Sequence, residues 1–221
     1  MGQDSRCILA NEEQIRQFIK CRDLDEPSQS HGKTVWEDNF SHWKYKLRLG
    51  DQAYLSTEDT PKKLKKGEYI TIKPGDFALL ITKEKVILDK ETMAFISMRF
   101  DYKQKGLINV SGFHVDPYYE GKLIFSVFNA GARDIVLRQG DPVFMIFFQK
   151  ISEAIDKDKP TTGYDFIPAD MVEQIRGKSA TLASNASRLD KVEFHLKVVG
   201  GLCLAAVVLL LGIVIRKYFG D

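Results

Sequence analysis

The chain has 221 residues and carries 32 Lys and Arg against 30 Asp and Glu, which leaves a formal net charge of +2. Because charges of both signs are mixed along the whole length, no tract predicts nucleic-acid binding by electrostatics. The 3 cysteines and 4 histidines are too widely spaced for a disulfide framework or a metal-ligand motif, so no metal site is expected.

The extreme N-terminus contains no apolar signal segment, which predicts that the N-terminal part of the chain stays in the cytoplasm. From Ile8 to Cys21 apolar residues recur at helical spacing, and Asn11 precedes two glutamates as an N-cap would. A short amphipathic helix is therefore expected here. Residues 22–42 show little periodicity and predict a loop or a locally ordered excursion.

From Tyr45 onward, short runs of β-type residues alternate with turns rich in Gly, Pro and Asp. Such strands are too closely spaced to alternate with helices, so they predict an all-β sandwich or barrel. The turn residues supply the tight reversals that this fold needs. The expected strands are Tyr45–Leu49, Gln52–Ser56, Tyr69–Ile72, Phe77–Thr82, Val86–Leu88, Met93–Arg99, Gly106–Val110, Lys122–Phe128, Asp134–Leu137 and Val143–Phe148.

After Ile151 a charged, proline-containing segment marks the end of this domain, which is expected to span residues 1–155. Residues 156–197 are predicted as a linker and a helical stalk, because apolar residues recur at heptad spacing from Ile175 to Leu196. Gly177 and several serines interrupt the run. The segment is therefore either a coiled-coil stalk or an irregular helix that leads to a membrane.

The segment Val198–Ile215 carries no charged residue and is followed by Arg216, Lys217 and a short tail. As an α-helix it would be about 27 Å long, close to the hydrocarbon thickness of a bilayer. We expect a single transmembrane helix over residues 198–215, with 216–221 as the tail. Basic residues flank both ends, so the positive-inside rule does not set the orientation. The missing signal segment predicts a membrane protein with a cytoplasmic N-terminal domain.

Four segments of the β-rich region have the order and spacing found in one enzyme superfamily: Tyr45–Gly50, Ile72–Leu80, Gly112–Lys122 and Asn129–Asp141. With them, the region from Ile8 to Ile151 resembles the dCTP deaminase and dUTPase superfamily. This resemblance implies a mainly β, dUTPase-like distorted β-barrel or jelly roll. It also implies a homotrimer with nucleotide sites between neighbouring subunits, and a trimer would suit a coiled-coil stalk.

The resemblance further implies a site for a deoxypyrimidine nucleotide. Asp116 would lie near sugar and base as the candidate catalytic residue, and Tyr119 would pack against the deoxyribose. Backbone groups of the hairpin before Asp116 would read the pyrimidine edge by their hydrogen-bond pattern. His114 in this hairpin is either a ligand contact or a bulge residue. The implied nucleotide-binding residues are Arg99, Ser111, Gly112, His114, Val115 and Tyr119.

Two of the departures from the family pattern affect the expected chemistry directly. Ser126 occupies the place of the family's glutamate, the general acid and base that activates water, and a serine without a neighbouring base cannot do this near neutral pH. The family's phosphate-binding Arg-Ser-Ser segment corresponds to Arg99–Lys105, in which only the first arginine stays in place. Lys103 and Lys105 are the phosphate candidates here, although at strand spacing they would share one charged face with Asp101.

These observations favour a membrane-anchored, trimeric dCTP deaminase/dUTPase-like protein that lacks deaminase chemistry and serves as a nucleotide-binding, signalling or defence module. One alternative is an active dCTP deaminase or dUTP diphosphatase-type enzyme, with water positioned by Asp116 and Mg²⁺ held mainly by the substrate phosphates. A third is a structural trimer that presents a surface to a partner protein. All three functions remain open at this point.

Overall fold

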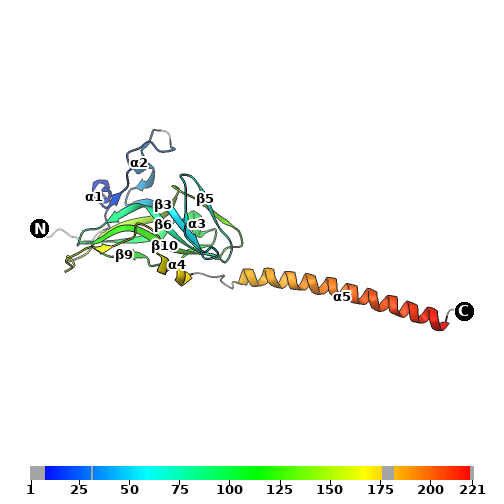
Figure 1. Cartoon of the computed structure of the whole chain (residues 1–221). Helices are drawn as coiled ribbons and strands as arrows, with labels where there is room; N and C mark the ends of the chain where they lie inside the picture. The colour runs from blue at the N-terminus through cyan, green and yellow to red at the C-terminus, as the bar shows by residue number, and fades with distance from the viewer. Residues whose placement is uncertain (1–7, 31, 176–181, 220–221) are drawn as a thin grey trace. The chain divides into compact units, whose positions relative to one another are not determined.

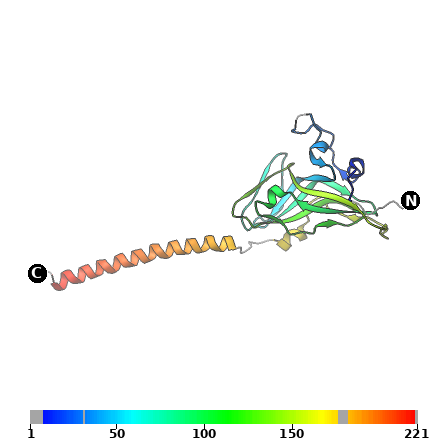
Figure 2. The same cartoon turned by 180° about the vertical axis from the view of Figure 1, so that it is seen from behind.

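The computed structural model describes residues 8–30, 32–175 and 182–219, and it divides the chain into two compact units, Met1–Ser179 and Ala180–Asp221. The N-terminus up to Cys7, His31 and the part of the expected stalk around Gly177 lie outside the described residues. Figure 1 shows the first unit as a β-rich body and the second as the helix α5, and Figure 2 shows both from behind. The mainly β fold with an apolar C-terminal helix is confirmed.

The first unit consists mostly of β-strands, with short helices between and after them. In chain order the described elements are α1 (Glu12–Arg16), β1 (Ile19–Lys20), α2 (Val35–Asn39), β2 (Phe40–Ser41), β3 (Lys44–Leu55), β4 (Lys62–Lys63), β5 (Tyr69–Ile72), β6 (Phe77–Ile87), β7 (Thr92–Met98), α3 (Phe100–Lys103), β8 (Leu107–Asn109), β9 (His114–Val115), β10 (Tyr119–Asn129), β11 (Ile135–Arg138), β12 (Pro142–Lys150), β13 (Thr161–Thr162), α4 (Ala169–Ile175) and α5 (Leu182–Phe219).

The long strand β3 is the centre of a curled sheet whose strand order is β13-β10-β6-β3-β12-β7-β9. Its first half pairs with β12, and its second half pairs with β6. Between the two halves β3 passes so close to β6 that a Cβ on Gly50 would lie 2.7 Å from the carbonyl oxygen of Thr82. Because only glycine fits at such a close approach, Gly50 lets β3 belong to both layers of the curled sheet. One layer contains β12, β7 and β9, and the other contains β6 and β10.

The hydrophobic core fills the space between these two layers. Strand β7 alternates buried and half-buried residues along its whole length, so one face of it points inward. Phe125 of β10 stacks on Phe144 of β12, and Trp36 of α2 stacks on Tyr45 of β3. These contacts join both layers and the N-terminal excursion around one core.

A second, smaller cluster covers the outer face of the layer formed by β3, β6 and β10. Ile167 and Val172 are buried there against side chains that include Leu79 and Ile81. Helix α4, which carries Val172, lies on the opposite side of the sheet from α2 in both views (Figures 1 and 2). The chain therefore stays packed on the sheet as far as Ile175.

The N-terminal region contains more regular structure than the sequence predicts. The expected helix from Ile8 to Cys21 is shorter, because α1 ends at Arg16 and β1 then pairs with β6. Its predicted cap is confirmed, since the Asn11 side chain accepts a hydrogen bond from the Gln14 N–H. The excursion of residues 22–42 contains α2, whose start is fixed by a capping box between Thr34 and Glu37.

Two pairs of expected strands are single strands in the structure. Residues 45–49 and 52–56 were predicted as separate strands but form β3, which keeps pairing through a register shift between Leu49 and Ala53. Residues 77–82 and 86–88 likewise form β6. The residues between them are polar, as in a turn, but Glu84 is buried and accepts a hydrogen bond from Arg48 of β3.

The C-terminal unit contains one helix that is long and apolar enough to cross a membrane. Over the described residues this segment is Leu189–Leu209, with a mean hydropathy of 1.9. The expected span 198–215 lies on the same helix. The heptad residues are divided between two helices, because Met171 and Ile175 belong to α4 and pack against the sheet.

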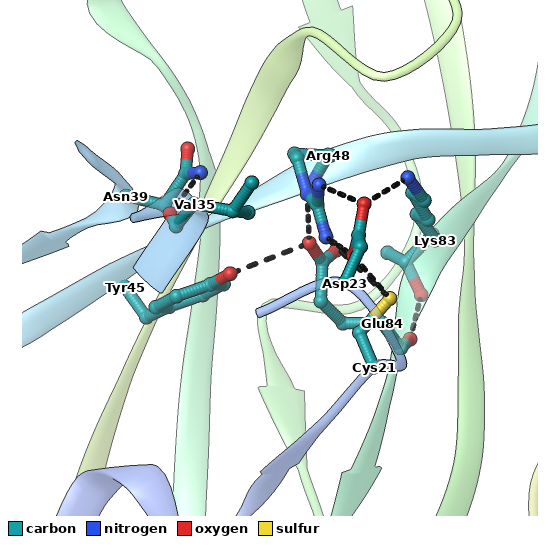
Figure 3. A network of polar contacts seen from close by, with 9 residues as sticks. Cys21, Asp23, Val35, Asn39, Tyr45, Arg48, Lys83 and Glu84 are labelled. Atoms are coloured by element: carbon teal, nitrogen blue, oxygen red, sulfur yellow. Dashed lines mark hydrogen bonds and ion pairs between the residues drawn. The ribbon is translucent and has the colours of Figure 1, made fainter. Parts of the chain in front are cut away.

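A buried ion network joins β3, β6 and the N-terminal excursion (Figure 3). Glu84 is fully buried and accepts hydrogen bonds from Arg48 Nε at 2.6 Å and from the Arg48 main-chain N–H at 2.8 Å. Arg48 also donates to both carboxylate oxygens of Asp23, at 2.7 and 2.9 Å. Burial alone would raise the pKa of Asp23, but the hydrogen bonds from Arg48 and Lys83 outweigh it and hold that pKa well below its usual range.

The Arg48→Met variant is expected to lose about 3–5 kcal/mol of unfolding free energy, because Glu84 is left buried without its cation. Arg48→Met/Glu84→Leu should recover much of this loss, since an apolar pair removes the stranded charge. Lys62→Met, which breaks an exposed pair with Glu68, serves as the control and should change stability little. Urea unfolding of the purified protein measures all three, and equal losses for Arg48→Met and Lys62→Met would contradict the role of the network.

Candidate functional site

The site expected from the resemblance lies between β8 and β10, in a segment that we call the site hairpin (Asn109–Tyr119). Asn109 organises its start, because its side-chain oxygen accepts from the Ser111 hydroxyl at 2.6 Å and its amide donates to the Gly112 carbonyl at 3.3 Å. The Ile96 N–H of β7 donates to the Phe113 carbonyl at 2.8 Å. The hairpin backbone is thus held by the sheet while Gly112 and Phe113 stay exposed, an arrangement that can read a ligand by hydrogen bonds.

His114 and Asp116 lie together in the site hairpin. His114 Nε2 is 3.3 Å from Asp116 Oδ1, and the two side chains are 44% and 69% exposed. His114 lies in register opposite Phe95 of β7, so it is a paired strand residue and not an extra bulge residue. Its role as a ligand contact stays a prediction.

Ser126 of β10 contacts the start of the site hairpin through its backbone. Its carbonyl oxygen accepts hydrogen bonds from the N–H groups of Val110 at 2.8 Å and Ser111 at 3.3 Å. Its side chain is half-buried on the strand face that carries Ile124, and the residue pairs with Leu79 of β6. Among the described residues, no carboxylate or imidazole is hydrogen bonded to the Ser126 hydroxyl.

Tyr119 contacts the chain segment that follows the sheet, which we call the C-terminal strap (Pro160–Ile175). The Tyr119 hydroxyl donates to the Lys122 carbonyl at 2.7 Å, and a Cβ on Gly163 would lie 2.2 Å from the Tyr119 hydroxyl oxygen. Burial raises the pKa of Tyr119. The ring that the resemblance places against a deoxyribose is therefore in close contact with the strap in this structure.

The strap is attached to the site hairpin's end by main-chain hydrogen bonds. Strand β13 pairs in parallel with the start of β10, and the Thr161 N–H donates to the Tyr118 carbonyl at 2.7 Å. The Gly163 N–H donates to the Glu120 carbonyl at 2.6 Å. Any movement at Tyr118 and Tyr119 must therefore strain or break the strap contacts.

The segment Arg99–Lys105 is not a strand, and the predicted strand spacing is wrong. Phe100–Lys103 form helix α3, with Arg99 as N-cap. The Arg99 guanidinium is paired with Asp101 at 2.5 Å and donates to the Pro142 carbonyl at 3.2 Å. Lys103 donates to the Ser97 hydroxyl at 2.7 Å, and Lys105 lies over the ring of Tyr102. Arg99 is thus partly neutralised by its own neighbour.

The expected site residues fall into two groups. One contains Ser111, Gly112, His114, Val115, Asp116, Tyr119 and Ser126, and the other contains Arg99, Lys103 and Lys105. The first group lies in or beside the site hairpin, and the second lies at the end of β7. Within the described part of the chain, no hydrogen bond or ion pair joins the two groups. Sequence reasoning missed Asn109 and Gly163, whose roles depend on contacts that only the fold creates.

The donor set around Asp116 can be compared with the needs of Mg²⁺. Within the residues that the structure describes, no group of three or more His, Cys, Asp and Glu could hold a metal ion. Asp116 offers one exposed carboxylate. Because Mg²⁺ in such sites is commonly held by one or two carboxylates together with substrate phosphates, these residues fit only an ion that arrives with a triphosphate.

Comparison with known proteins gives the class of fold. The chain is similar to the 2'-deoxycytidine 5'-triphosphate deaminase from Agrobacterium tumefaciens, with a TM-score of 0.53 at 15% identity over 66% of this chain and 49% of that one. At this identity the likeness concerns the fold alone.

Sequence comparisons give the family. A family model described as dCTP deaminase-like matches residues 45–151. A dCTP deaminase of Thermococcus kodakarensis is 30% identical over 115 residues, which cover 52% of this chain and 72% of that protein. One of Idiomarina loihiensis is 31% identical over 90 residues, 40% of this chain and 46% of that protein. The chain belongs to the dCTP deaminase-like family, and it spans less than half of the Idiomarina relative.

The Gly163→Ala variant is expected to loosen the strap, because the added methyl group would overlap Tyr119 and lie 2.8 Å from the Gly121 Cα. Overpacking of this kind costs about 1–3 kcal/mol. Limited proteolysis should then cut the strap faster than in the wild type. Gly112→Ala is the matched control, since a Cβ there meets no atom within 4 Å. Equal cleavage of the wild type and both variants would contradict the packing of Gly163 on Tyr119.

Proposed function

We propose that this protein is a membrane-anchored homotrimer that binds a deoxypyrimidine nucleotide at the site hairpin and acts as a signalling or defence module without deaminase chemistry. The observation that carries the proposal is the environment of the Ser126 hydroxyl. At the position that the resemblance gives to the family's general acid and base, the hydroxyl has no hydrogen-bonded carboxylate or imidazole among the described residues. Water activation for deamination needs such a group, whereas the held backbone of the site hairpin needs none in order to bind.

The trimer is supported by the separation of the two groups of site residues. A nucleotide at the site hairpin needs cations for its phosphates, and within the described residues of one chain no hydrogen bond or ion pair joins the side chains of α3 to that hairpin. A neighbouring subunit that places its α3 beside the hairpin would complete the site. The pairing of Arg99 with Asp101 predicts weaker phosphate binding than in a relative with the full Arg-Ser-Ser segment.

The membrane anchor is supported by the composition of α5, whose segment Leu189–Leu209 is long and apolar enough to span a bilayer. With the N-terminal domain in the cytoplasm, the site would lie on that side of the membrane. The strap lies along the chain between the proposed nucleotide site and the proposed membrane anchor, because it contacts Tyr119 at one end and is followed by α5. A nucleotide-dependent change at the hairpin would thus reach the segment before the anchor.

A second candidate is an active deoxypyrimidine triphosphate hydrolase. It is favoured by the His114–Asp116 pair, whose 3.3 Å contact provides a possible base for water. Mg²⁺ would then enter with the substrate. In this case the chemistry would be hydrolysis at phosphate, which does not depend on a glutamate at position 126.

Nucleotide binding is tested with the purified full-length protein in detergent, by thermal unfolding with dCTP, dUTP and Mg²⁺. We expect a rise in melting temperature, because a ligand at about 100 times its Kd stabilises the native state by about 2.7 kcal/mol. No deaminated or hydrolysed product should form over hours. Asp116→Asn should reduce the rise, whereas Asp134→Asn, which removes the same charge from an exposed loop, should leave it unchanged.

The outcomes separate the candidates. Turnover that Asp116→Asn abolishes would replace the first proposal by the hydrolase. No turnover and no shift with any pyrimidine nucleotide would overturn both. A single subunit per detergent particle, measured by light scattering, would overturn the homotrimer.

A further inference from the structure

A concave surface lies over β1, β6 and the start of β10. It is a cleft of about 1080 Å³, lined by seven basic and five acidic side chains. Pockets for small ligands usually measure about 300–1,000 Å³, so this cleft is large enough for one. None of the residues assigned to the nucleotide site lines it.

Three lysines form a row across neighbouring strands in this cleft. Lys20 of β1 lies directly opposite Lys85 of β6, and Lys85 lies directly opposite Lys122 of β10. Lys83 shares their face, because it is two residues from Lys85 on the same strand. Like charges directly opposite each other destabilise a sheet, so the row does not serve strand pairing, and it concentrates positive charge on one surface.

The carboxylates that neutralise this row are partly exposed. Lys85 pairs with Asp165 at 2.8 Å and Lys122 with Asp51 at 3.4 Å, and the two aspartate side chains are 69% and 48% exposed. Exposed ion pairs contribute little net free energy, so an anionic ligand can replace them at low cost. Two further lining cations, Arg22 and Lys66, make no ion pair with any residue that the structure describes.

The floor of the cleft is tied to the buried ion network. Lys83 is hydrogen bonded to Asp23, and Asp23 is held by Arg48, which is itself fixed by the buried Glu84 (Figure 3). The cations therefore sit on a preorganised surface, which lowers the ordering cost of binding.

We propose that this cleft, called here the lysine cleft (Lys20, Lys83, Lys85 and Lys122, with Arg22 and Lys66), binds a multiply phosphorylated anion. Lysine ammonium groups bind phosphate as strong point charges and hydrogen-bond donors. Because several lysines are spread over three strands, they match a ligand that carries more than one phosphate better than they match a ligand that carries a single carboxylate. Several phosphates occur together in free polyphosphates, in nucleotides and in the headgroups of polyphosphorylated lipids.

The lysine cleft also shares a residue with the strap. Asp165 belongs to the strap and forms an ion pair with Lys85. A bound phosphate and Asp165 would therefore compete for the same ammonium group. Removing the Asp165 charge should therefore tighten binding of the anion. Binding of the anion should in turn weaken one of the strap's polar contacts.

The test titrates inorganic tripolyphosphate into the full-length protein in detergent, by calorimetry at fixed ionic strength. Lys85→Gln/Lys122→Gln is expected to weaken binding about tenfold or more, which is the loss expected for two charge-assisted contacts. Asp165→Asn is expected to tighten it several-fold, a result that a misfolded variant would not give. Lys62→Gln/Lys63→Gln is the charge-matched control on β4, outside the cleft, and should bind as the wild type does.

Water-soluble dihexanoyl phosphatidylinositol bisphosphate, whose headgroup carries several phosphates, forms the second arm of the test. Binding of tripolyphosphate alone identifies a free polyphosphate as the ligand type, and competition by the short-chain lipid identifies a lipid phosphate. No binding of either probe would overturn the proposal. Loss of tripolyphosphate binding in Lys103→Gln/Lys105→Gln but not in Lys85→Gln/Lys122→Gln would also overturn it, since the anion would then lie at α3 in the proposed nucleotide site.

Discussion

The fold depends on the shared guanidinium of Arg48. Arg48 lies where β3 passes from one layer of the sheet to the other, since it pairs with Pro142 of β12 while the next residue, Leu49, pairs with Thr82 of β6. A cation at this buried point is tolerated only if Glu84 and Asp23 are both in place. The charge therefore ties three segments that are distant in sequence, and a chain with β3 and β6 out of register would leave two or three charges buried without partners.

The same ion network also fixes the positions of the two proposed sites, the site hairpin and the lysine cleft. Strand β6 carries Glu84 inward and Lys83 and Lys85 on the opposite face, so fixing Glu84 fixes the lysine cleft. The same strand pairs with β10 from Glu120 to Phe128, which sets Ser126 and the end of the site hairpin. The strap then adds to the edge of β10 and connects Tyr119, at one site, with Asp165, at the other. A ligand at either of these proposed sites would act on the same short segment.

The sequence predicts those parts of the fold that are decided locally. Strand β5 has the bounds that were expected, because turn residues flank it, and the Asn11 cap is confirmed because capping is a local interaction. The sequence alone does not reveal contacts made at a distance. Gly50 marks a close approach to β6 rather than a turn, and β1 ends the first helix by pairing with a strand far along the chain.

The same distinction holds for the candidate site. The alignment of motifs was sufficient to find Ser126 and the altered segment after Arg99, because each departure is a change of residue type at a fixed spacing. That segment's helical form was not expected, since a row of charged and aromatic residues after a strand fits either structure. Asn109, Gly163 and the lysine row were missed because their roles come from tertiary neighbours. The pairing of Lys20, Lys85 and Lys122 exists only once β1, β6 and β10 are side by side.

A binding site without a general base differs from an enzyme site in what it can report. An enzyme consumes its ligand, so its occupancy depends on turnover as well as on concentration. A site that binds without turnover has an occupancy set by ligand concentration and Kd alone, and its whole binding free energy is available to bias the protein between two states. In this chain the element that such binding would bias is the strap. Its first part is held by main-chain hydrogen bonds, the contact of Gly163 with Tyr119 and one exposed ion pair, and its second part by the buried side chains of Ile167 and Val172. A serine at position 126 and a strap in contact with Tyr119 would therefore both favour the proposed reversible structural response over chemistry.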